Sequence, residues 1–255
     1  MNNPNIVHLN GHGVGTLNYN GKVTNNVKYM IFEYCPNRDL FAYANLGRFT
    51  ERQAKNIFKK ILLGVQALHE HGYCHRNLKL ENILLDHNYS PKINDFMFTT
   101  QFLQNNQQIA LNDFVGTRNN RSPQIHDHQP YNGEKADIFS LGATLFTLVT
   151  GLIGFEMATR RDDFYKYIIL GDTNKYWNAQ NEQLNNLKIS LSDEFKDLYI
   201  SMIQYNENDR PNIADILNHH WFDEINYLDN EELNDLEIDV RNDFLSRVNK
   251  IVKDY

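Results

Sequence analysis

The spacing of hydrophobic positions changes several times along this chain, and each spacing predicts a particular element. Residues 54–68 place apolar side chains every three or four positions, the pattern of a long amphipathic helix with one face toward a core. Thr50 and Gln53 have the spacing of a capping box, so we expect this helix to begin directly after Thr50 and to end at Gly72. Residues 138–154 are the most apolar stretch, but they are short for a membrane span and include four hydroxyl side chains, so we expect a buried helix.

The first part of the chain has the shorter apolar runs that predict strands. Residues 28–35 form a run rich in aromatic and aliphatic side chains, which predicts a buried strand. The three glycines within residues 11–15 invite comparison with a phosphate-binding loop, but Thr16 stands where that motif requires its last glycine. We therefore expect an ordinary strand there, followed by a turn at residues 18–21.

Two further helices are expected toward the end of the chain. Ser192 has the position of an N-cap ahead of a helical apolar pattern. The last apolar side chains repeat on one face of a helix, at Phe244, Leu245, Val248, Ile251 and Val252. Calmodulin targets are basic amphipathic helices, whereas this one follows an acidic run, so calmodulin is not an expected partner. Two interpretations of the helix stay open: packing on the chain's own body, or docking to another protein.

Residues 73–97 contain the densest set of side chains suited to catalysis or metal binding. Asn82 and Asp95 supply hard oxygen ligands of the kind that Mg²⁺ prefers. Lys79 supplies a positive charge that could stabilise a transferring phosphoryl group. Asn77 lies beside them, and its neutral amide cannot take a proton, whereas general-base help typically contributes about 10²–10⁴-fold to a rate. The stretch therefore keeps metal ligands and lacks a base.

This stretch resembles the catalytic loop and metal-binding motif of eukaryotic serine/threonine protein kinases. Residues 75–79 read His-Arg-Asn-Leu-Lys, and residues 95–97 read Asp-Phe-Met, which is similar to the family's H-R-D-L-K-x-x-N and D-F-G. Lys79 is typical of the serine/threonine class, and the calcium/calmodulin-dependent group is the most similar one. Other motifs of the family are resembled, in the expected order, by residues 4–9, 116–124, 136–142, 208–211 and 219–222.

The resemblance implies an α+β, protein-kinase-like fold with a complete, mainly helical large lobe and a truncated small lobe of about two strands. We expect residues 1–35 to be a remnant of the small lobe and hinge, residues 36–222 to be the large lobe, and residues 223–255 to be an acidic tail with an amphipathic helix. In the family, the segment similar to residues 4–9 follows the glycine-rich loop, the strand lysine and the helix glutamate. These three features are therefore expected to be absent.

The resemblance also implies Mg-ATP as a cofactor and assigns residues to it. Glu33 and Cys35 would bond adenine through their backbone, Asp39 would face the ribose, and Leu84 would be a further nucleotide-binding position. Asp39 suits a helix start equally well. Asn82 and Asp95 would bind the metal, Lys79 would act on the phosphate, and Asn77 replaces the family's catalytic aspartate.

Two structural expectations follow from the same resemblance, and a third follows from composition. Asp137 should bond the backbone of the catalytic loop. Gln124 replaces a glutamate that pairs with Arg210 in the family, so an amide-to-cation hydrogen bond and a looser docking segment are expected. Residues 98–124 are polar and rich in Gln and Asn, which predicts mobility.

Charge and cysteine usage exclude several classes of protein. The net charge is −7 with a pI of about 5.8, and residues 223–255 hold ten acidic and four basic residues, so nucleic acid is not an expected partner. The two cysteines form no disulfide pattern and no signal peptide is visible, which favours a cytoplasmic protein without a membrane partner. His69, His71, Cys74 and His75 are close in sequence, but they lack the paired spacing of a zinc site.

These observations predict a serine/threonine-protein-kinase-like protein that is a catalytically inactive pseudokinase. Its exposed small-lobe face or its C-terminal helix would bind another protein chain, because open strand edges and apolar patches invite partners. The alternative is an active ATP-dependent serine/threonine kinase whose missing small lobe comes from a longer N-terminus or from a partner. A third hypothesis is a module that binds ATP without turnover.

Overall fold

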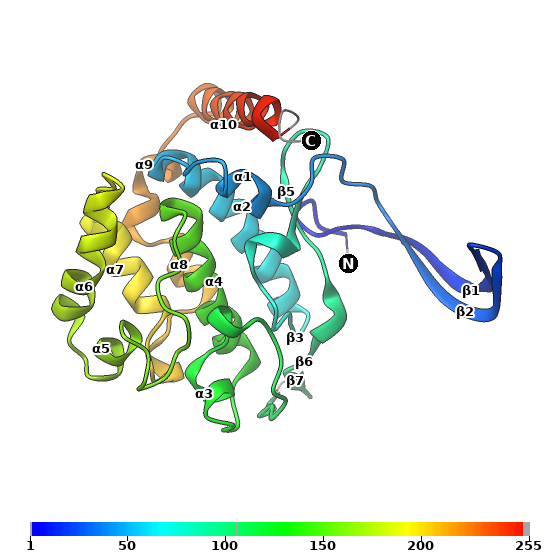
Figure 1. The fold of residues 1–255 in the computed structure, drawn as a ribbon, viewed down its shortest axis with the longest axis horizontal. Helices are drawn as coiled ribbons and strands as arrows, with labels where there is room; N and C mark the ends of the chain where they lie inside the picture. Colours follow the sequence, from blue (N-terminus) through cyan, green and yellow to red (C-terminus); the bar gives the residue numbers. More distant parts are fainter. Residues whose placement is uncertain (1, 106, 252–255) are drawn as a thin grey trace.

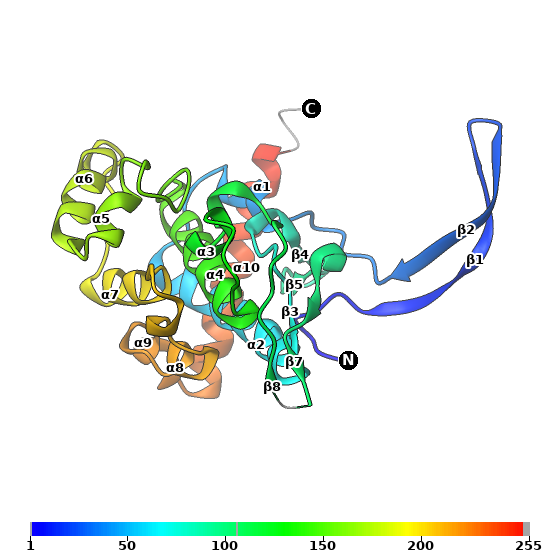
Figure 2. The same ribbon diagram turned by 90° about the horizontal axis from the view of Figure 1, so that it is seen from below.

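A long β-hairpin projects from a mainly helical body in the computed structural model of this chain (Figures 1 and 2). The structure describes residues 2–105 and 107–251, the side chains of 249–251 excepted. The strands are β1 (Leu9–Tyr19), β2 (Lys22–Phe32), β3 (Tyr73–Cys74), β4 (Ile83–Leu85), β5 (Pro91–Ile93), β6 (Thr100–Gln101), β7 (Leu103–Gln104) and β8 (Gln107–Gln108). The α-helices are α1 (Leu40–Ala44), α2 (Glu51–Glu70), α3 (Pro123–His126), α4 (Gly133–Thr150), α5 (Tyr165–Ile169), α6 (Thr173–Asn186), α7 (Asp193–Met202), α8 (Ile213–Leu217), α9 (Asp223–Asn226) and α10 (Asn230–Ile251).

The described strands pair as two-stranded antiparallel sheets, in the pairs β1–β2, β3–β6, β4–β5 and β7–β8. Helices make up most of the body, as the α+β prediction expects. In the part of the chain that the structure describes, no helix is both long and apolar enough to cross a membrane.

The two central helices form where the hydrophobic pattern predicts them. The hydroxyl of Thr50 accepts a hydrogen bond from the Gln53 backbone at 3.2 Å, and the Gln53 side chain accepts one from the Thr50 backbone at 3.1 Å, so the capping box is confirmed. Gly72 follows α2 with a φ of 78°, a left-handed conformation that glycine adopts without strain. Helix α4 is buried along almost its whole length, which confirms the predicted buried helix.

The hairpin differs from its prediction in one respect. The strand expected at residues 28–35 forms as part of β2, but its side chains are mostly exposed rather than buried. Nothing in the described part of the chain packs on either face of the arm, which meets the body only at its base (Figure 2). Burial is a property of neighbours, so an apolar run alone could not settle it. The turn at Asn20 and Gly21 has positive φ at both residues, as an ordinary strand and turn require.

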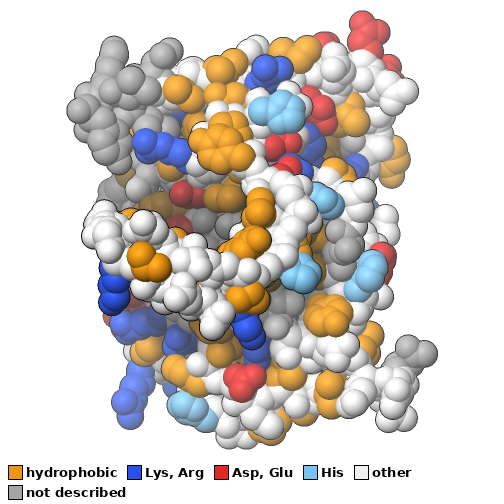
Figure 3. All heavy atoms as spheres, turned by 90° about the vertical axis from the view of Figure 1, so that its right-hand side faces the viewer, with side chains coloured by type: hydrophobic (Ala, Val, Ile, Leu, Met, Phe, Trp, Pro, Cys, Tyr) orange, Lys and Arg blue, Asp and Glu red, His pale blue; other side chains and the backbone are white. Residues whose placement is uncertain are grey.

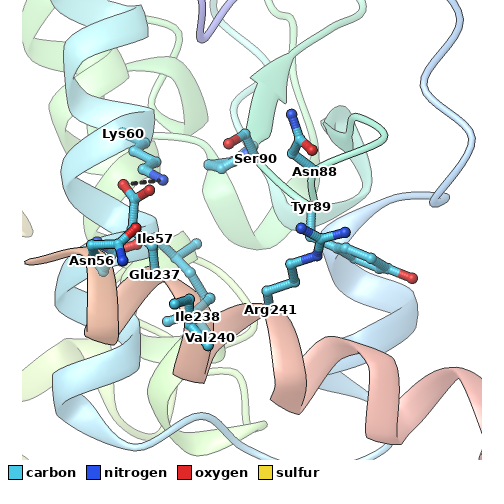
Figure 4. A pocket seen from close by; sticks show the side chains of 12 residues that line it. Asn56, Ile57, Lys60, Asn88, Tyr89, Ser90, Glu237, Ile238, Val240 and Arg241 are labelled. Atoms are coloured by element: carbon cyan, nitrogen blue, oxygen red, sulfur yellow. Dashed lines mark ion pairs between the residues drawn. The ribbon is translucent and has the colours of Figure 1, made fainter.

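The C-terminal helix α10 packs against the body along its apolar face. Leu236, Val240 and Phe244 are buried there, so the interpretation as a helix packed on its own large lobe is confirmed. The predicted positions Ile251 and Val252 lie outside the described side chains. A cleft of about 260 Å³ remains between α2, α10 and the turn before β5, and the ion pair of Lys60 with Glu237 at 2.9 Å lies along it (Figure 4).

Candidate active site

The loop at residues 75–82 is anchored from below by the buried carboxylate of Asp137. Its two oxygens accept hydrogen bonds from the backbone N–H groups of His75 and Arg76, each at 2.7 Å, which confirms the predicted role. His69, near the end of α2, lies 2.9 Å from the same carboxylate through its Nε2. Asp137 has no exposed surface, so these three donors offset the desolvation of its charge.

Asn77 uses both ends of its amide inside this loop. Its Nδ2 donates to Oδ2 of Asp95 at 3.2 Å, and its Oδ1 accepts from the hydroxyl of Thr117 at 2.9 Å. Thr117 therefore bonds the catalytic loop. The loop closes on itself as well, because Nδ2 of Asn82 donates to the backbone oxygen of Asn77 at 2.8 Å. One amide thus joins the loop, the following motif and the segment around residue 117.

Asp95 adopts a left-handed backbone conformation, with φ of 64° and ψ of 72°. Aspartate is one of the residues that tolerate this region, since its short polar side chain can bond locally. Its Oδ1 lies 3.4 Å from the backbone N–H of Met97, and the ring of Phe96 meets His75 edge-on at 5.4 Å. Met97 is 81% exposed and does not have positive φ, so the residue that replaces the family's glycine is unstrained here.

Asn82 and Asp95 carry oxygen atoms of the type that a hard cation prefers. Asp95 presents a carboxylate. Asn82 bonds Asn77 through its nitrogen, and its Oδ1 makes no hydrogen bond with a described residue. Both groups lie at one end of the loop, through their shared contact with Asn77. Lys79 is near them in sequence and lies 3.8 Å from Glu81. These oxygens match the ligand type of Mg²⁺, although a single carboxylate gives a weakly charged site.

The hinge candidates lie between the end of β2 and the start of α1, apart from Leu84 in β4. Asp39 caps α1 by accepting a hydrogen bond from the Ala42 backbone at 2.9 Å, so of its two predicted roles the helix start is confirmed. It also pairs with Leu84 through an isolated bridge, which places these two residues side by side. Glu33 accepts from Lys92 at 2.9 Å, and its backbone N–H donates to the His8 oxygen at 2.8 Å, so it ties the base of the hairpin to the body.

The two cysteines should differ strongly in reactivity. Burial, followed by the nearby charge of Glu33, raises the pKa of the half-buried Cys35 thiol, while Cys74 is completely buried and burial raises its pKa much further. We expect a maleimide to modify Cys35 at least about tenfold faster than Cys74 in the folded protein. Mass spectrometry of timed samples measures both rates, and equal rates would contradict the packing around Cys74. Slower labelling of Cys35 with Mg-ATP present would place nucleotide at the hinge.

His75 predicts a dependence of stability on pH. Complete burial lowers its pKa below the ordinary 6.5, partly offset by Asp137 and by the carbonyl of Asn94, which accepts from Nε2 at 2.9 Å. The unfolded chain therefore binds more protons just below pH 6.5, so the stability contributed by neutral His75 is present above that pH and lost as pH falls.

We expect the free energy of unfolding in urea to be about 1 kcal/mol lower at about pH 5.5 than at about pH 7.5 from this residue. The variant His75→Gln should have a flatter pH dependence, and the exposed control His87→Gln should keep the original slope. A slope unaffected by His75→Gln would show that other groups cause it.

Sequence reasoning missed the contacts that hold residues 98–124 in place. Arg76 donates to Asp113 at 2.6 Å, to the hydroxyl of Tyr131 at 3.1 Å, and to the backbone oxygen of Phe98 at 2.7 Å. The described part of the segment includes strands β6 to β8 and helix α3, and its predicted mobility stays a prediction. Asp113, an acidic residue between the motifs at residues 95–97 and 116–124, was the only sequence signal for this contact. Only the fold brings it to Arg76.

The bond predicted between Gln124 and Arg210 is present. Nη2 of Arg210 donates to Oε1 of Gln124 at 2.8 Å, and the same guanidinium donates to the backbone oxygens of Gln204, Lys135 and Tyr205. Burial lowers the pKa of Arg210 to about 10. Carbonyl dipoles around Arg210 thus take the place of the carboxylate that the family has at position 124. The looser substrate-docking segment expected from this replacement stays a prediction.

Comparison with known proteins agrees with this geometry. The family model described as protein kinase domain matches residues 1–222. Serine/threonine-protein kinase SRK2A of Physcomitrium patens is 33% identical over 196 residues, and SRK2C of Arabidopsis thaliana is 32% identical over 196 residues, each match covering 76% of this chain. Sperm motility kinase 2B of Mus musculus is 31% identical over 197 residues, or 77% of the chain. The aligned part spans 53%, 54% and 37% of SRK2A, SRK2C and the sperm motility kinase, respectively.

Proposed function

This chain belongs to the protein kinase family and has a serine/threonine-kinase-like domain, and on that premise we propose that it is catalytically inactive and acts as a protein-binding or scaffold subunit. The family generally uses Mg-ATP, and Asn82 and Asp95 are the residues that would hold the metal. Mg²⁺ would neutralise charge on the phosphate oxygens. The proposal concerns what this chain's own residues do around that site.

The observation that carries the proposal is the double hydrogen bond of Asn77. A kinase base must accept the proton of the substrate hydroxyl, but the Asn77 amide is not basic and its oxygen already accepts from Thr117. Its nitrogen donates to Oδ2 of Asp95, so this carboxylate oxygen is bonded to the loop. Loss of the base alone would leave a slow kinase, because phosphoryl transfer depends mostly on positioning and electrostatics. In a native protein that also lacks the family's phosphate-binding lysine, lost positioning would cost a further ~7–11 kcal/mol.

The binding role is supported by the hairpin. Its side chains include several that are hydrophobic and more than half exposed, at Val14, Leu17, Tyr19, Val23, Met30 and Ile31. Figure 3 faces this side of the molecule and shows hydrophobic side chains along the arm. Both strands have an outer edge without a partner in the described part of the chain, which favours strand addition by another chain. The chain's own α10 packs on α2 instead, so another protein is the proposed partner.

Light scattering after size exclusion tests the binding role, since an arm with this surface should associate measurably as concentration rises. The variant Met30→Asp should weaken association, while Leu170→Asp is the matched control because Leu170 is 71% exposed outside the hairpin. A protein that remains monomeric at every concentration would count against this role.

A specific geometry favours the alternative of an active kinase. Asp95, Asn82 and Lys79 are all retained, and Phe96 packs on His75 beneath the loop. On this hypothesis a longer N-terminus or a partner supplies the strand lysine and glycine-rich loop of the family. Transfer of radiolabelled phosphate at ordinary kinase rates by this chain would establish it, and the mass of the native protein would show whether a longer chain exists. Thermal shift with Mg-ATP identifies the third hypothesis, since binding to the folded state alone raises the melting temperature.

The variant Asn77→Asp tests the contact at the centre of the proposal. It replaces an N–H donor with a second carboxylate beside Asp95, so we expect the free energy of unfolding to fall by about 1–3 kcal/mol at neutral pH. The loss should shrink with added Mg²⁺, which would neutralise the pair, and also at acidic pH, where one carboxyl is protonated.

The control for this variant is Asn178→Asp, which adds the same charge at an exposed position of α6. Urea unfolding measures both variants. An Asn77→Asp protein as stable as the parent would mean that the bond between Asn77 and Asp95 is not maintained in solution.

A further inference from the structure

The cleft of about 260 Å³ between α2, α10 and the turn before β5 is lined by three segments that are far apart in the sequence (Figure 4). Ile57 of α2 and Val240 of α10 are buried and give it an apolar side. Ile238 lies beside them and is 48% exposed. The candidate active-site residues are not among the described residues that line the cleft. A ligand in it would therefore contact α10 and the body together, away from the catalytic loop.

The charged groups of the cleft leave one positive charge without a partner. Lys60 and Glu237 neutralise each other in an ion pair at 2.9 Å. Arg241 also lines the cleft, and its side chain forms no ion pair or hydrogen bond with any residue that the structure describes. Figure 4 shows it extending from α10 toward the turn. These three are the charged side chains among the described lining residues, so the unpaired guanidinium favours a ligand with a single negative charge.

Asn56 supplies a buried polar group that lacks a partner. The residue is only 5% exposed, and its side-chain amide forms no hydrogen bond with any residue that the structure describes. Its polar atoms are not among the unbonded side-chain atoms that are sealed from solvent, so they keep accessible surface where Asn56 lines the cleft. A buried amide without a partner is costly. Because an amide both donates and accepts, the best-matched partner is a ligand that carries an amide of its own.

The turn on the opposite side of the cleft is held in a fixed shape. Oδ1 of Asp86 accepts hydrogen bonds from the backbone of Asn88 at 2.8 Å and of Ser90 at 3.0 Å. Tyr89, between them, has a positive φ of 63°, and its ring stacks on Phe244 of α10 at 5.5 Å. The hydroxyl of the half-buried Ser90 forms no hydrogen bond with a described residue. It is therefore a second polar group of the cleft that is free to bond a ligand.

We propose that this cleft binds a small carboxylate that also carries an amide and an aliphatic group, the chemistry of an N-acylated amino acid or of a peptide C-terminus. The carboxylate would pair with Arg241, the amide would bond Asn56, and the aliphatic group would lie on Ile57 and Val240. A phosphate dianion suits the cleft less well, because its second charge would lie near Glu237. A bound ligand would also hold α10 to α2. The cleft is separate from the hairpin and the catalytic loop, so the inference does not rest on the proposed function.

The test uses the full chain labelled with ¹⁵N and the probe N-acetyl-L-leucine, followed by NMR. We expect saturable shifts at the backbone amides of Asn56, Ser90 and Arg241, and slower hydrogen exchange along α10. N-acetyl-L-leucine amide lacks the charge and isocaproate lacks the amide, so each should bind at least about fivefold more weakly. Inorganic phosphate should also bind more weakly than the probe. No saturation, or an affinity for any of these three compounds equal to that for the probe, would overturn the proposal.

Variants assign each part of the probe to a side chain. Arg241→Gln should weaken binding of the probe at least about fivefold, whereas Arg161→Gln, at an exposed position outside the cleft, should bind it as the parent does. Asn56→Ala should bind the probe and isocaproate equally, because the partner of the amide is gone. Urea unfolding shows that each variant is folded. Unchanged affinity in Arg241→Gln, or a preference for the probe that persists in Asn56→Ala, would contradict the proposed contacts.

A tripeptide that ends in leucine distinguishes the two sources of this chemistry. If the tripeptide binds at least as tightly as N-acetyl-L-leucine, the site is assigned to a polypeptide C-terminus. If N-acetyl-L-leucine alone binds, the site is assigned to a free small molecule. Equal binding of the tripeptide with a free and with an amidated C-terminus would overturn the proposal, since Arg241 would then not recognise a carboxylate.

Discussion

The variant Asp137→Ala is expected to lower the free energy of unfolding by about 3–5 kcal/mol. The carboxylate has no exposed surface and accepts hydrogen bonds from the backbone of His75 and Arg76, each at 2.7 Å. Alanine would leave both buried N–H groups without a partner, and each such group costs about 1–3 kcal/mol. His69 would lose the acceptor for its Nε2 as well.

Urea unfolding monitored by circular dichroism measures this loss. Asp163→Ala is the control, since the Asp163 side chain is 92% exposed and its ion pair with Lys166 contributes little, within about 0.5 kcal/mol. If Asp137→Ala lost no more stability than Asp163→Ala, the loop would not depend on this anchor.

The variant Phe244→Ala is expected to destabilise the protein by a similar amount, about 3–5 kcal/mol. Phe244 is completely buried between α10 and the body, with its ring edge-on to Tyr43 at 4.9 Å and stacked on Tyr89 at 5.5 Å. The cavity left by alanine would have little means of closing, because Arg247 fixes the same face by donating to the backbone oxygens of Tyr43, Gly47 and Arg48.

The neighbouring residue supplies the control for α10. Leu245 is 44% exposed on the same helix, so Leu245→Ala should change stability by less than about 1 kcal/mol. Hydrogen exchange of the α10 amides should increase in Phe244→Ala and remain near the parent's in Leu245→Ala. Equal effects of the two variants would mean that α10 is only loosely attached to the body.

Local chemistry let the sequence predict much of the body and the loop. Thr50 and Gln53 define the start of α2 because a capping box is made by residues three apart, and Gly72 ends it because its backbone adopts positive φ. The role of Asp137 followed from a resemblance that extends over consecutive motifs. The predicted bond between Gln124 and Arg210 formed for the same reason. These features need only neighbours in sequence, or partners fixed by a shared family fold.

The predictions that failed concerned burial and long-range partners. The apolar run at residues 28–35 predicted a buried strand, yet β2 is largely exposed because no described element covers it. The polar composition of residues 98–124 could not show that Arg76 bonds Asp113 and so ties the segment to the body, while its predicted mobility stays a prediction. Composition shows which side chains of a segment could be buried or form hydrogen bonds. Whether they are buried or bonded depends on the neighbouring segments in the fold.

The sequence by itself determined the family, the order of elements, and the replacement of a base by Asn77. Only the tertiary structure decided that Asn77 bonds both Asp95 and Thr117 and that the hairpin stands apart from the body. Helical periodicity and caps depend on residues a few positions apart, so the local sequence is enough to predict them. A hydrogen bond between residues 77 and 117, or an exposed strand face, depends on how distant segments are placed, which no local pattern specifies.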